Sequence, residues 1–237
     1  MSFSIELLVI IFLSAFIQSA FGFGFILFSL SVGSLFFPVK EFLPFCLIMG
    51  IFIDFFLAVT NFKHRPKKHF DFILMGVLGS PIGVFLYFLM GSNIFDPILG
   101  ILLIICVLLT FYDKVLIPST KALRYFAGFS TGILAGAFGI SGPFVSLVLL
   151  SDQTLNRKGM IFLMNVFFFA VASISLPCFY YKGLYNGVEF TNFSLMLVSA
   201  AFGYLLGAVF GKYFSSHQYN NVLLIMILIS AISLIIP

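Results

Sequence analysis

The chain is a succession of long apolar runs separated by short segments that hold nearly all of its charges. Eight runs can be traced, over residues 4–37, 41–61, 70–90, 94–112, 121–150, 159–181, 188–211 and 219–237. About 20 apolar residues in a helix cross the hydrocarbon core of a bilayer. All runs except the first and the fifth therefore predict one transmembrane helix each.

The first and fifth runs are longer, and each contains the same glycine-containing interruption. Ala20-Phe-Gly-Phe-Gly-Phe25 recurs 117 positions later as Ala137-Phe-Gly-Ile-Ser-Gly-Pro143. Helices over residues 5–20 and 25–37 would measure about 24 and 20 Å, short of the ~30 Å core. Two half-length helices around a break predict a re-entrant hairpin, because backbone at that depth must be buried in protein or line a polar cavity.

The positions of the basic residues favour hairpins over full crossings. If all eight runs cross once, the side of the loop at residues 63–68 holds eight of the twelve Lys and Arg residues. If the first and fifth runs are hairpins, Arg157, Lys158 and Lys212 join that side, which then holds ten, and only Lys40 and Lys182 lie opposite. Basic residues gather on the cytoplasmic side of membrane proteins, so the hairpin arrangement is preferred.

These features predict an all-α polytopic membrane protein with two inverted-topology repeats, each a glycine-broken re-entrant hairpin plus three transmembrane helices. The first repeat is residues 1–113, with a hairpin at 4–37 and helices at 41–61, 70–90 and 94–112. The second is residues 121–237, with a hairpin at 121–150 and helices at 159–181, 188–211 and 219–237. Matched GxxxG spacings at Gly79–Gly83 and Gly203–Gly207 support the duplication, although this spacing is also common in ordinary helix packing.

Composition narrows the class of protein further. Of 237 residues, 62% are hydrophobic and 8% are charged, which excludes a soluble domain. The net charge of +4 lies in short loops, so it indicates topology and not nucleic-acid binding. Cys46, Cys106 and Cys178 are far apart and predict free thiols without metal-ligand spacing. No Lys or Arg precedes Lys40, so we expect the first run to be retained and not cleaved as a signal peptide.

The two interruptions are candidate anion-binding sites. Ser141-Gly-Pro143 is typical of a helix start, since Ser is a good N-cap and Pro is preferred at the first helical position, so we expect a helix from Pro143 to Leu150. A helix that begins inside the membrane points free N–H groups and its positive dipole end into the protein. The predicted substrate-binding residues are Gly22, Gly24, Phe25, Gly139, Ser141, Gly142, Pro143 and Asn165. The alternative is a pair of helix-breaking turns that serve packing alone.

Asp54 is the one acidic residue well inside an apolar run, and a carboxyl group at that depth is costly. It is a candidate proton carrier, and the alternative is a structural hydrogen bond to a neighbouring helix. Asn165 can likewise present its amide to a ligand or to another helix. The polar residues beside the breaks are weaker candidates: Gln18, Ser19, Ser29, Thr131 and Ser146.

An enzymatic alternative comes from Gly139-Ile-Ser-Gly142, which looks like the GxSG motif of rhomboid-type intramembrane serine proteases. That chemistry needs a histidine within reach of the serine. His64, His69 and His217 all lie in or beside polar loops. The sequence therefore favours a non-enzymatic function.

The second motif, Gly136-Ala-Phe-Gly-Ile-Ser-Gly-Pro143, resembles the second-half signature of the TauE/SafE (sulfite exporter) family of membrane permeases, also called TSUP. Gly22-Phe-Gly-Phe25 resembles the first-half motif less fully. Family members often carry glycine where this chain has Ile26, proline where it has Ser31, and proline where it has Phe144. The resemblance covers nearly the whole chain. It implies transport of small sulfur-containing anions such as sulfite, sulfonates or related organic anions.

Together these features predict a secondary-active transporter of small anions in the cell membrane. Alternating access would operate around a midplane site between the two hairpin tips. A passive anion channel and a non-transporting membrane subunit are the alternatives. No nucleotide-binding motif is present, and no cofactor or metal is expected. The expected partners are the anion, protons as coupling ion and the lipid bilayer. A homodimer is compatible with the sequence.

Overall fold

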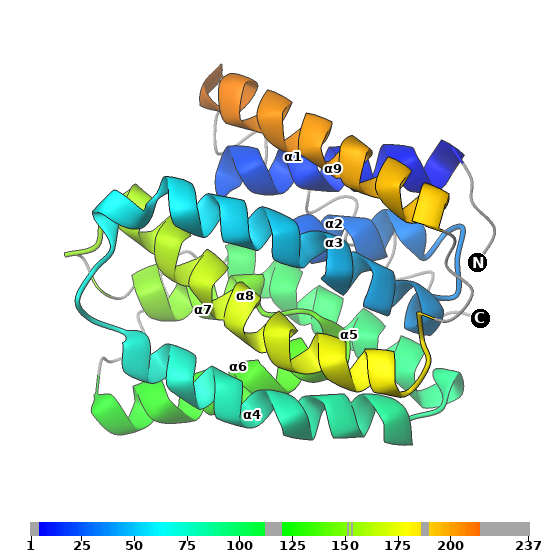
Figure 1. Ribbon diagram of the computed structural model, residues 1–237. Helices are drawn as coiled ribbons and strands as arrows, with labels where there is room; N and C mark the ends of the chain where they lie inside the picture. The colour runs from blue at the N-terminus through cyan, green and yellow to red at the C-terminus, as the bar shows by residue number, and fades with distance from the viewer. Residues whose placement is uncertain (1–4, 112–119, 151, 153, 186–189, 214–237) are drawn as a thin grey trace.

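The computed structural model is a bundle of helices over the residues that it describes, which are 5–111, 120–150, 152, 154–185 and 190–213 (Figure 1). The helices are α1 (Ile5–Phe21), α2 (Phe25–Gly33), α3 (Val39–Thr60), α4 (Phe70–Leu89), α5 (Ser92–Phe111), α6 (Lys121–Phe138), α7 (Gly142–Leu150), α8 (Arg157–Tyr181) and α9 (Phe190–Phe210). Two short 3-10 turns, η1 (Phe62–His64) and η2 (Gly211–Tyr213), follow α3 and α9. The described residues include no strand, which confirms the all-α prediction. The predicted helix at residues 219–237 lies outside them.

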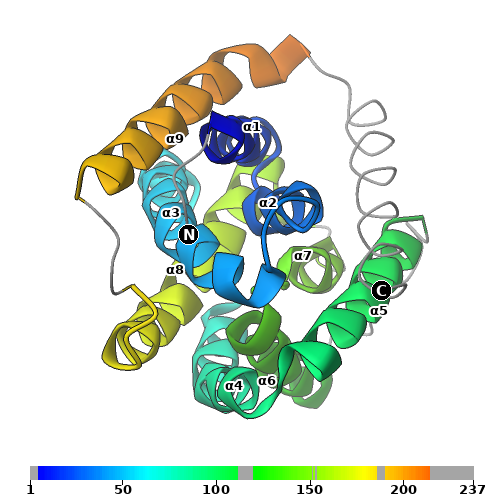
Figure 2. The ribbon, with the colours of Figure 1, turned by 90° about the vertical axis from the view of Figure 1, so that its right-hand side faces the viewer.

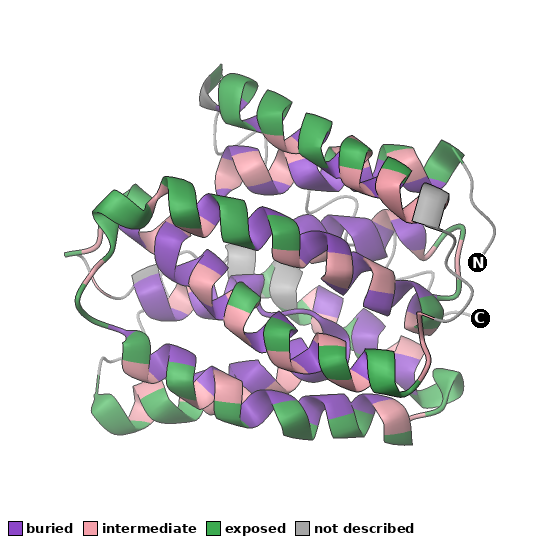
Figure 3. Cartoon of the chain, in the orientation of Figure 1, coloured by how far each residue is buried: buried purple, intermediate pink, exposed green. Residues whose placement is uncertain are grey.

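Several helices have the length and composition of membrane spans. In the described part of the chain, α3, α4, α8 and residues 192–210 of α9 are long and apolar enough to cross a bilayer. Figure 3 shows exposed residues on the outer faces of the bundle and buried residues toward its centre. On α4 the exposed stripe consists of Leu74, Leu78, Ile82 and Phe85, about one helical turn apart. Lipid is the solvent that such a stripe requires, so the chain is an integral membrane protein.

Each interrupted run forms a long helix followed by a short one. α1 has 17 residues and α2 has nine, while α6 has 18 and α7 has nine. In Figure 1, α2 returns toward the end of the bundle at which α1 begins. In Figure 2, α2 and α7 lie near the centre, with α1, α3, α8, α6 and α5 around them.

The second leg of the first hairpin is shorter than the predicted helix at residues 25–37. α2 ends at Gly33, where a side chain would collide with Phe42, since an added Cβ would lie 2.1 Å from its Cε1 atom. Residues 34–36 then turn, and Pro38 is the N-cap of α3, which begins at Val39 and not at residue 41. Pro38 lacks the N–H that a continuing helix would need and disfavours helical backbone at residue 37, so this leg ends in a turn after ~14 Å.

Glycines on α9 allow it to pack closely against α1. A Cβ at Gly203 would lie 2.2 Å from the Phe12 carbonyl oxygen, and one at Gly207 would lie 2.3 Å from that of Phe16. The residue numbers rise together along both helices, so the two helices run parallel.

The pair α4 and α6 makes the corresponding contacts. A Cβ at Gly79 would lie 2.2 Å from the Phe129 carbonyl oxygen, and one at Gly83 would lie 2.1 Å from that of Ile133. Phe129 and Ile133 stand 117 positions after the α1 residues Phe12 and Phe16. The predicted GxxxG segments thus make equivalent backbone contacts in both halves of the chain.

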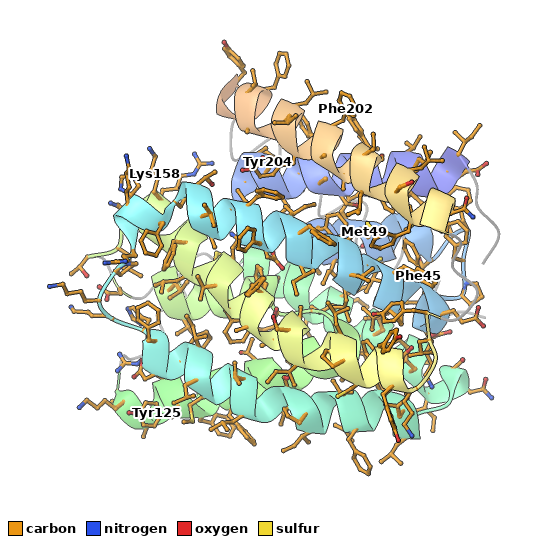
Figure 4. All side chains as sticks on the ribbon, in the orientation of Figure 1. Phe45, Met49, Tyr125, Lys158, Phe202 and Tyr204 are labelled. Atoms are coloured by element: carbon orange, nitrogen blue, oxygen red, sulfur yellow. The ribbon has the colours of Figure 1, made fainter. Side chains whose placement is uncertain are left out.

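One end of the bundle, which we call the basic end, collects most of the described cations. It comprises the α3–α4 connection and the starts of α6 and α8, with Lys63, Arg65, Lys67, Lys68, Lys121, Arg124, Arg157 and Lys158. Figure 4 shows Lys158 and Tyr125 at this end, opposite Phe45. Lys40 and Lys182, by contrast, contact the rings of Tyr87 and Phe88 near the other end of α4.

Two polar pairs join the segments at the basic end. Arg124 at the start of α6 bonds Asp71 at the start of α4, with 2.9 Å between Nη2 and Oδ2. His69 Nε2 lies 2.8 Å from Asp152 Oδ2, which connects the beginning of α4 to the segment after α7. The start of α6 and the exit of α7 therefore both lie beside the beginning of α4.

Candidate functional site

Both breaks are built on glycines with positive φ. Gly22 and Gly24 have φ values of 95° and 113°, and Gly139 has 70°. Residues with a side chain seldom adopt this left-handed region, so glycine is favoured where the chain leaves the helix here. The N–H of Gly22 donates to Gln18 O at 2.7 Å, and the N–H of Gly139 donates to Ala135 O at 2.9 Å. These helix ends are 117 positions apart and have the same geometry.

The short helices start immediately after the breaks. Phe28 N–H donates to Gly24 O, and Val145 N–H donates to Ser141 O, each at 2.9 Å. Ser141 thus directly precedes α7, as predicted for a cap. Pro143 is the second residue of α7 and not the first, a shift of one position that leaves it in the first turn, where a missing N–H costs nothing.

Both breaks reach one cavity of about 40 Å³. A water molecule needs roughly 10–15 Å³ on this measure, so the cavity has room for a few waters or one compact ion. α1, α2, α3, α6, α7 and α8 contribute to its wall, together with the break residues. The lining residues are Gln18, Gly24, Phe25, Ile26, Leu27, Leu47, Gly50, Asp54, Ala135, Gly139, Ser141, Gly142, Phe168, Val171 and Ala172.

A buried hydrogen-bond network surrounds the first break. Gln18 Oε1 accepts from the N–H of Phe25 at 2.9 Å, so a side chain on α1 caps the first amide of α2. Its Nε2 donates to Asp54 Oδ1 on α3 and, at 3.1 Å, to Asn165 Oδ1 on α8. Asn165 Nδ2 in turn donates to the carbonyl oxygens of Gly22 at 2.9 Å and Ile161 at 2.7 Å. Four helices and the break are therefore joined through two amide side chains.

The orientation of both amides follows from their partners. A backbone N–H can only donate, so the oxygen of Gln18 must face Phe25. Carbonyl oxygens only accept, so the nitrogen of Asn165 must face Gly22 and Ile161. Asp54 Oδ1 is consequently an acceptor in this network, and a proton on this carboxyl group belongs on Oδ2.

The structure brings together most of the predicted site residues. Gly24, Phe25, Gly139, Ser141, Gly142 and Asp54 line the cavity. Gly22 and Asn165 are not in its lining but are bonded to each other behind Gln18. Pro143 is also outside the lining and stands in the first turn of α7.

Gln18 is the residue whose role sequence reasoning missed, since it ranked among the weaker flanking candidates. The available signal was a long polar side chain one turn before the break, within reach of the next helix start. Three other flanking residues make structural bonds: Ser19 Oγ to Tyr204 O, Ser29 Oγ to Ser14 Oγ, and Ser146 Oγ to Pro143 O. Thr131 is buried on α6 outside the cavity lining.

The two halves of the chain contribute different side chains to the cavity. Of the described lining residues, Asp54 alone is ionisable. The positions 117 residues from Gln18 and Asp54 are Ala135 and Val171, and both line the same cavity. In the described part of the chain no three His, Cys, Asp or Glu residues are grouped as a metal site. The arrangement can offer backbone amides, a hydroxyl and a carboxyl group to a small ligand.

Comparison with known proteins gives one match. No curated protein and no solved structure matches the chain. The sequence profile described as "Sulfite exporter TauE/SafE" matches residues 7–234, nearly the whole length. The chain therefore belongs to the sulfite exporter TauE/SafE family of membrane transporters.

Proposed function

We propose that this protein is a secondary-active carrier of small sulfur-containing anions, such as sulfite or a sulfonate, in the cell membrane. The anion would occupy the cavity between the two breaks, with protons as the coupling ion. The supporting observation is that the tips of both interrupted runs and the buried Asp54 line one small cavity. Family membership makes transport of sulfite-like anions the expected activity.

The second tip offers the groups that an anion needs. Ser141 is only 4% exposed and lines the cavity, and no hydrogen bond from its hydroxyl is found in the described structure. The first-turn amides of α7 have no partners within their own helix, and they carry the positive end of its dipole. A hydroxyl and helix-start amides together can hold an oxyanion without a buried Lys or Arg.

Alternating access in this proposal rests on two inverted repeats, residues 1–113 and 121–237. Three observations support the repeats: the matched breaks, the similar contacts of α1 with α9 and of α4 with α6, and the basic end. In transporters of this design one bundle rocks against the other around a fixed central site. The two hairpins would contribute one tip each to that site.

Uptake of radiolabelled sulfite into proteoliposomes tests the proposal with a Gly139→Ala variant. Gly139 has φ 70°, and an added Cβ would lie 2.7 Å from Leu43 Cδ1 and 2.9 Å from Ile26 Cγ2, so an alanine is strained there and either these side chains or the second tip must shift. A misplacement of ~1 Å can reduce a rate by about 100-fold, so we expect at least a tenfold loss of uptake.

Gly91→Ala is the matched control, because nothing lies within 4 Å of a Cβ there and it should keep full uptake. Ser141→Ala preserves the backbone, and we expect it to raise the KM for sulfite. Full uptake by both Gly139→Ala and Ser141→Ala would refute the site between the tips. A wild-type protein that moves neither sulfite nor any sulfonate would refute the substrate class.

A further inference from the structure

We propose that Gln18 is a positioning residue that makes anion binding at the first tip depend on protonation of Asp54. In the structure Gln18 Oε1 occupies the Phe25 N–H, and Gln18 Nε2 is held by Asp54. The first tip would thus be closed by an internal ligand and would open to an anion when Asp54 takes up a proton. This inference rests on the proposed function and adds the coupling step to it.

The two tips differ in this respect. The position equivalent to Gln18 beside α7 is Ala135, which has no side-chain acceptor. The N–H of Phe25 faces an amide oxygen, whereas the start of α7 faces the cavity with the Ser141 hydroxyl beside it. An anion can therefore use the second tip directly, but at the first tip it must displace Gln18.

Asp54 determines how firmly Gln18 is held. A hydrogen bond to an ionised carboxylate is about twice as strong as one to a neutral acceptor. When a proton from the cavity water binds Oδ2, the bond from Gln18 Nε2 to Oδ1 weakens, and the protonated carboxyl group becomes a donor itself. The Phe25 N–H and the Asp54 hydroxyl can then both face the anion, and the proton returns to water on the other side of the membrane.

Other charged groups are too far away to replace Asp54 in this role. α2 carries none, and Glu6 stands at the opposite end of α1 from Gln18. On α8 the charged residues are Arg157 and Lys158, eight and seven residues before Asn165, or about 12 and 10 Å along the helix. The Arg157 guanidinium reaches the Ala20 carbonyl oxygen at 3.4 Å, outside the cavity lining. On α3, Glu41 lies in the first turn, and Lys63 and His64 lie in η1, beyond the end of the helix. On the other neighbouring helices, Asp96 lies near the start of α5, and Tyr204 of α9 packs on Phe56.

The amide of Phe25 can be observed directly. The chain contains three Gly-Phe dipeptides, which end at Phe23, Phe25 and Phe129. Carbonyl-¹³C glycine with ¹⁵N phenylalanine therefore selects three amide signals from the protein in nanodiscs. We expect the Phe25 signal to shift with pH in one titration step, while Phe129, within α6, does not.

Three variants separate coupling from a structural role. Gln18→Met removes the link and Asp54→Asn removes the proton, so both should abolish the pH shift of Phe25. Ser19→Ala is the control, since Ser19 bonds the Tyr204 carbonyl oxygen on α9, outside the cavity. An unchanged Phe129 signal shows that a variant is folded. The proposal would be overturned if the Phe25 signal does not change with pH in the wild type. It would also be overturned if this signal shifts with pH in Gln18→Met as it does in the wild type.

Adding anion distinguishes this inference from the proposed function. Methanesulfonate keeps its charge across the pH range, and sulfite is the second probe. We expect the wild type to bind methanesulfonate about tenfold more tightly at low pH than at high pH, which corresponds to one charged hydrogen bond. In Gln18→Met the affinity should not depend on pH. Tight binding without pH dependence in the wild type would refute the coupling and leave transport standing. A pH-sensitive Phe25 with no response to either anion would contradict the proposed function instead.

Discussion

Three buried polar residues at and beside the cavity have apolar counterparts in the other half of the chain. Gln18, Asp54 and Asn165 correspond, at a spacing of 117, to Ala135, Val171 and Ile48. All three polar side chains are at most 4% exposed, so each must be paired to be tolerated. The two breaks thus have similar backbones, and their side chains make them different.

Asp54 and the glycines could be chosen as candidate site residues from the sequence. A single carboxyl group within an apolar run and a repeated break are visible in the letters alone. The role of Gln18 could not be predicted, because its side chain reaches seven residues ahead across the break to Phe25. Its other partners, Asp54 and Asn165, come from helices that only tertiary packing brings together.

The Asp152 carboxylate at the basic end makes a pH-dependent contribution to stability. Hydrogen bonds from the Thr154 hydroxyl, then from His69, hold the pKa of Asp152 below its usual range. A lowered pKa stabilises the fold above the unfolded value near 4, and this stability is lost as the pH falls through the folded pKa. We expect Asp152→Asn to cost roughly 1 kcal/mol at pH 7, or about 2–4 °C in apparent Tm.

The difference between Asp152→Asn and the wild type should shrink as the pH is lowered below about 4 in thermal-shift measurements. Asp71→Asn is a useful comparison, because the partly exposed pair of Asp71 with Arg124 should contribute less. An equal Tm difference at pH 3 and pH 7 would show that ionisation of Asp152 is not the cause.

At the scale of the helices, the apolar runs correctly predicted which described segments are helical and in what order they follow. Helix ends were less accurate, since α2 stops four residues before the predicted 37, where Pro38 disfavours helical backbone. The pairing of α1 with α9 and of α4 with α6 was not predicted. The GxxxG spacings indicate that some helix approaches closely, but they do not say which one.

The equivalent contacts of α1 with α9 and of α4 with α6 should contribute similarly to the free energy of unfolding. Gly203→Ala and Gly79→Ala each place a Cβ 2.2 Å from a backbone carbonyl oxygen, of Phe12 and Phe129 respectively. Forcing the helices apart should cost each variant about 1–3 kcal/mol. Apparent Tm in detergent measures the loss, with Gly91→Ala as the neutral control. A large loss in one variant and none in the other would contradict the equivalence of the two pairs.

At the scale of the whole molecule, helices from the first half of the chain pack against helices from the second half. The first helix of each hairpin packs against a helix from the other half, so neither hairpin is held by its own half alone. Arg157 and Lys158 lie at the same end as the α3–α4 connection, which is where the hairpin arrangement puts them. Charge counting led to the prediction of hairpins because basic residues gather on one face of a membrane.

Sulfite counterflow tests the central claim, that the chain is an anion carrier, most directly. Proteoliposomes are preloaded with unlabelled sulfite and diluted into a trace of labelled sulfite. A carrier with one alternating site exchanges the two, so we predict a transient accumulation of label above equilibrium, present in Gly91→Ala and absent in Gly139→Ala. Equilibration without an overshoot, or an equal overshoot in Gly139→Ala, would contradict the account.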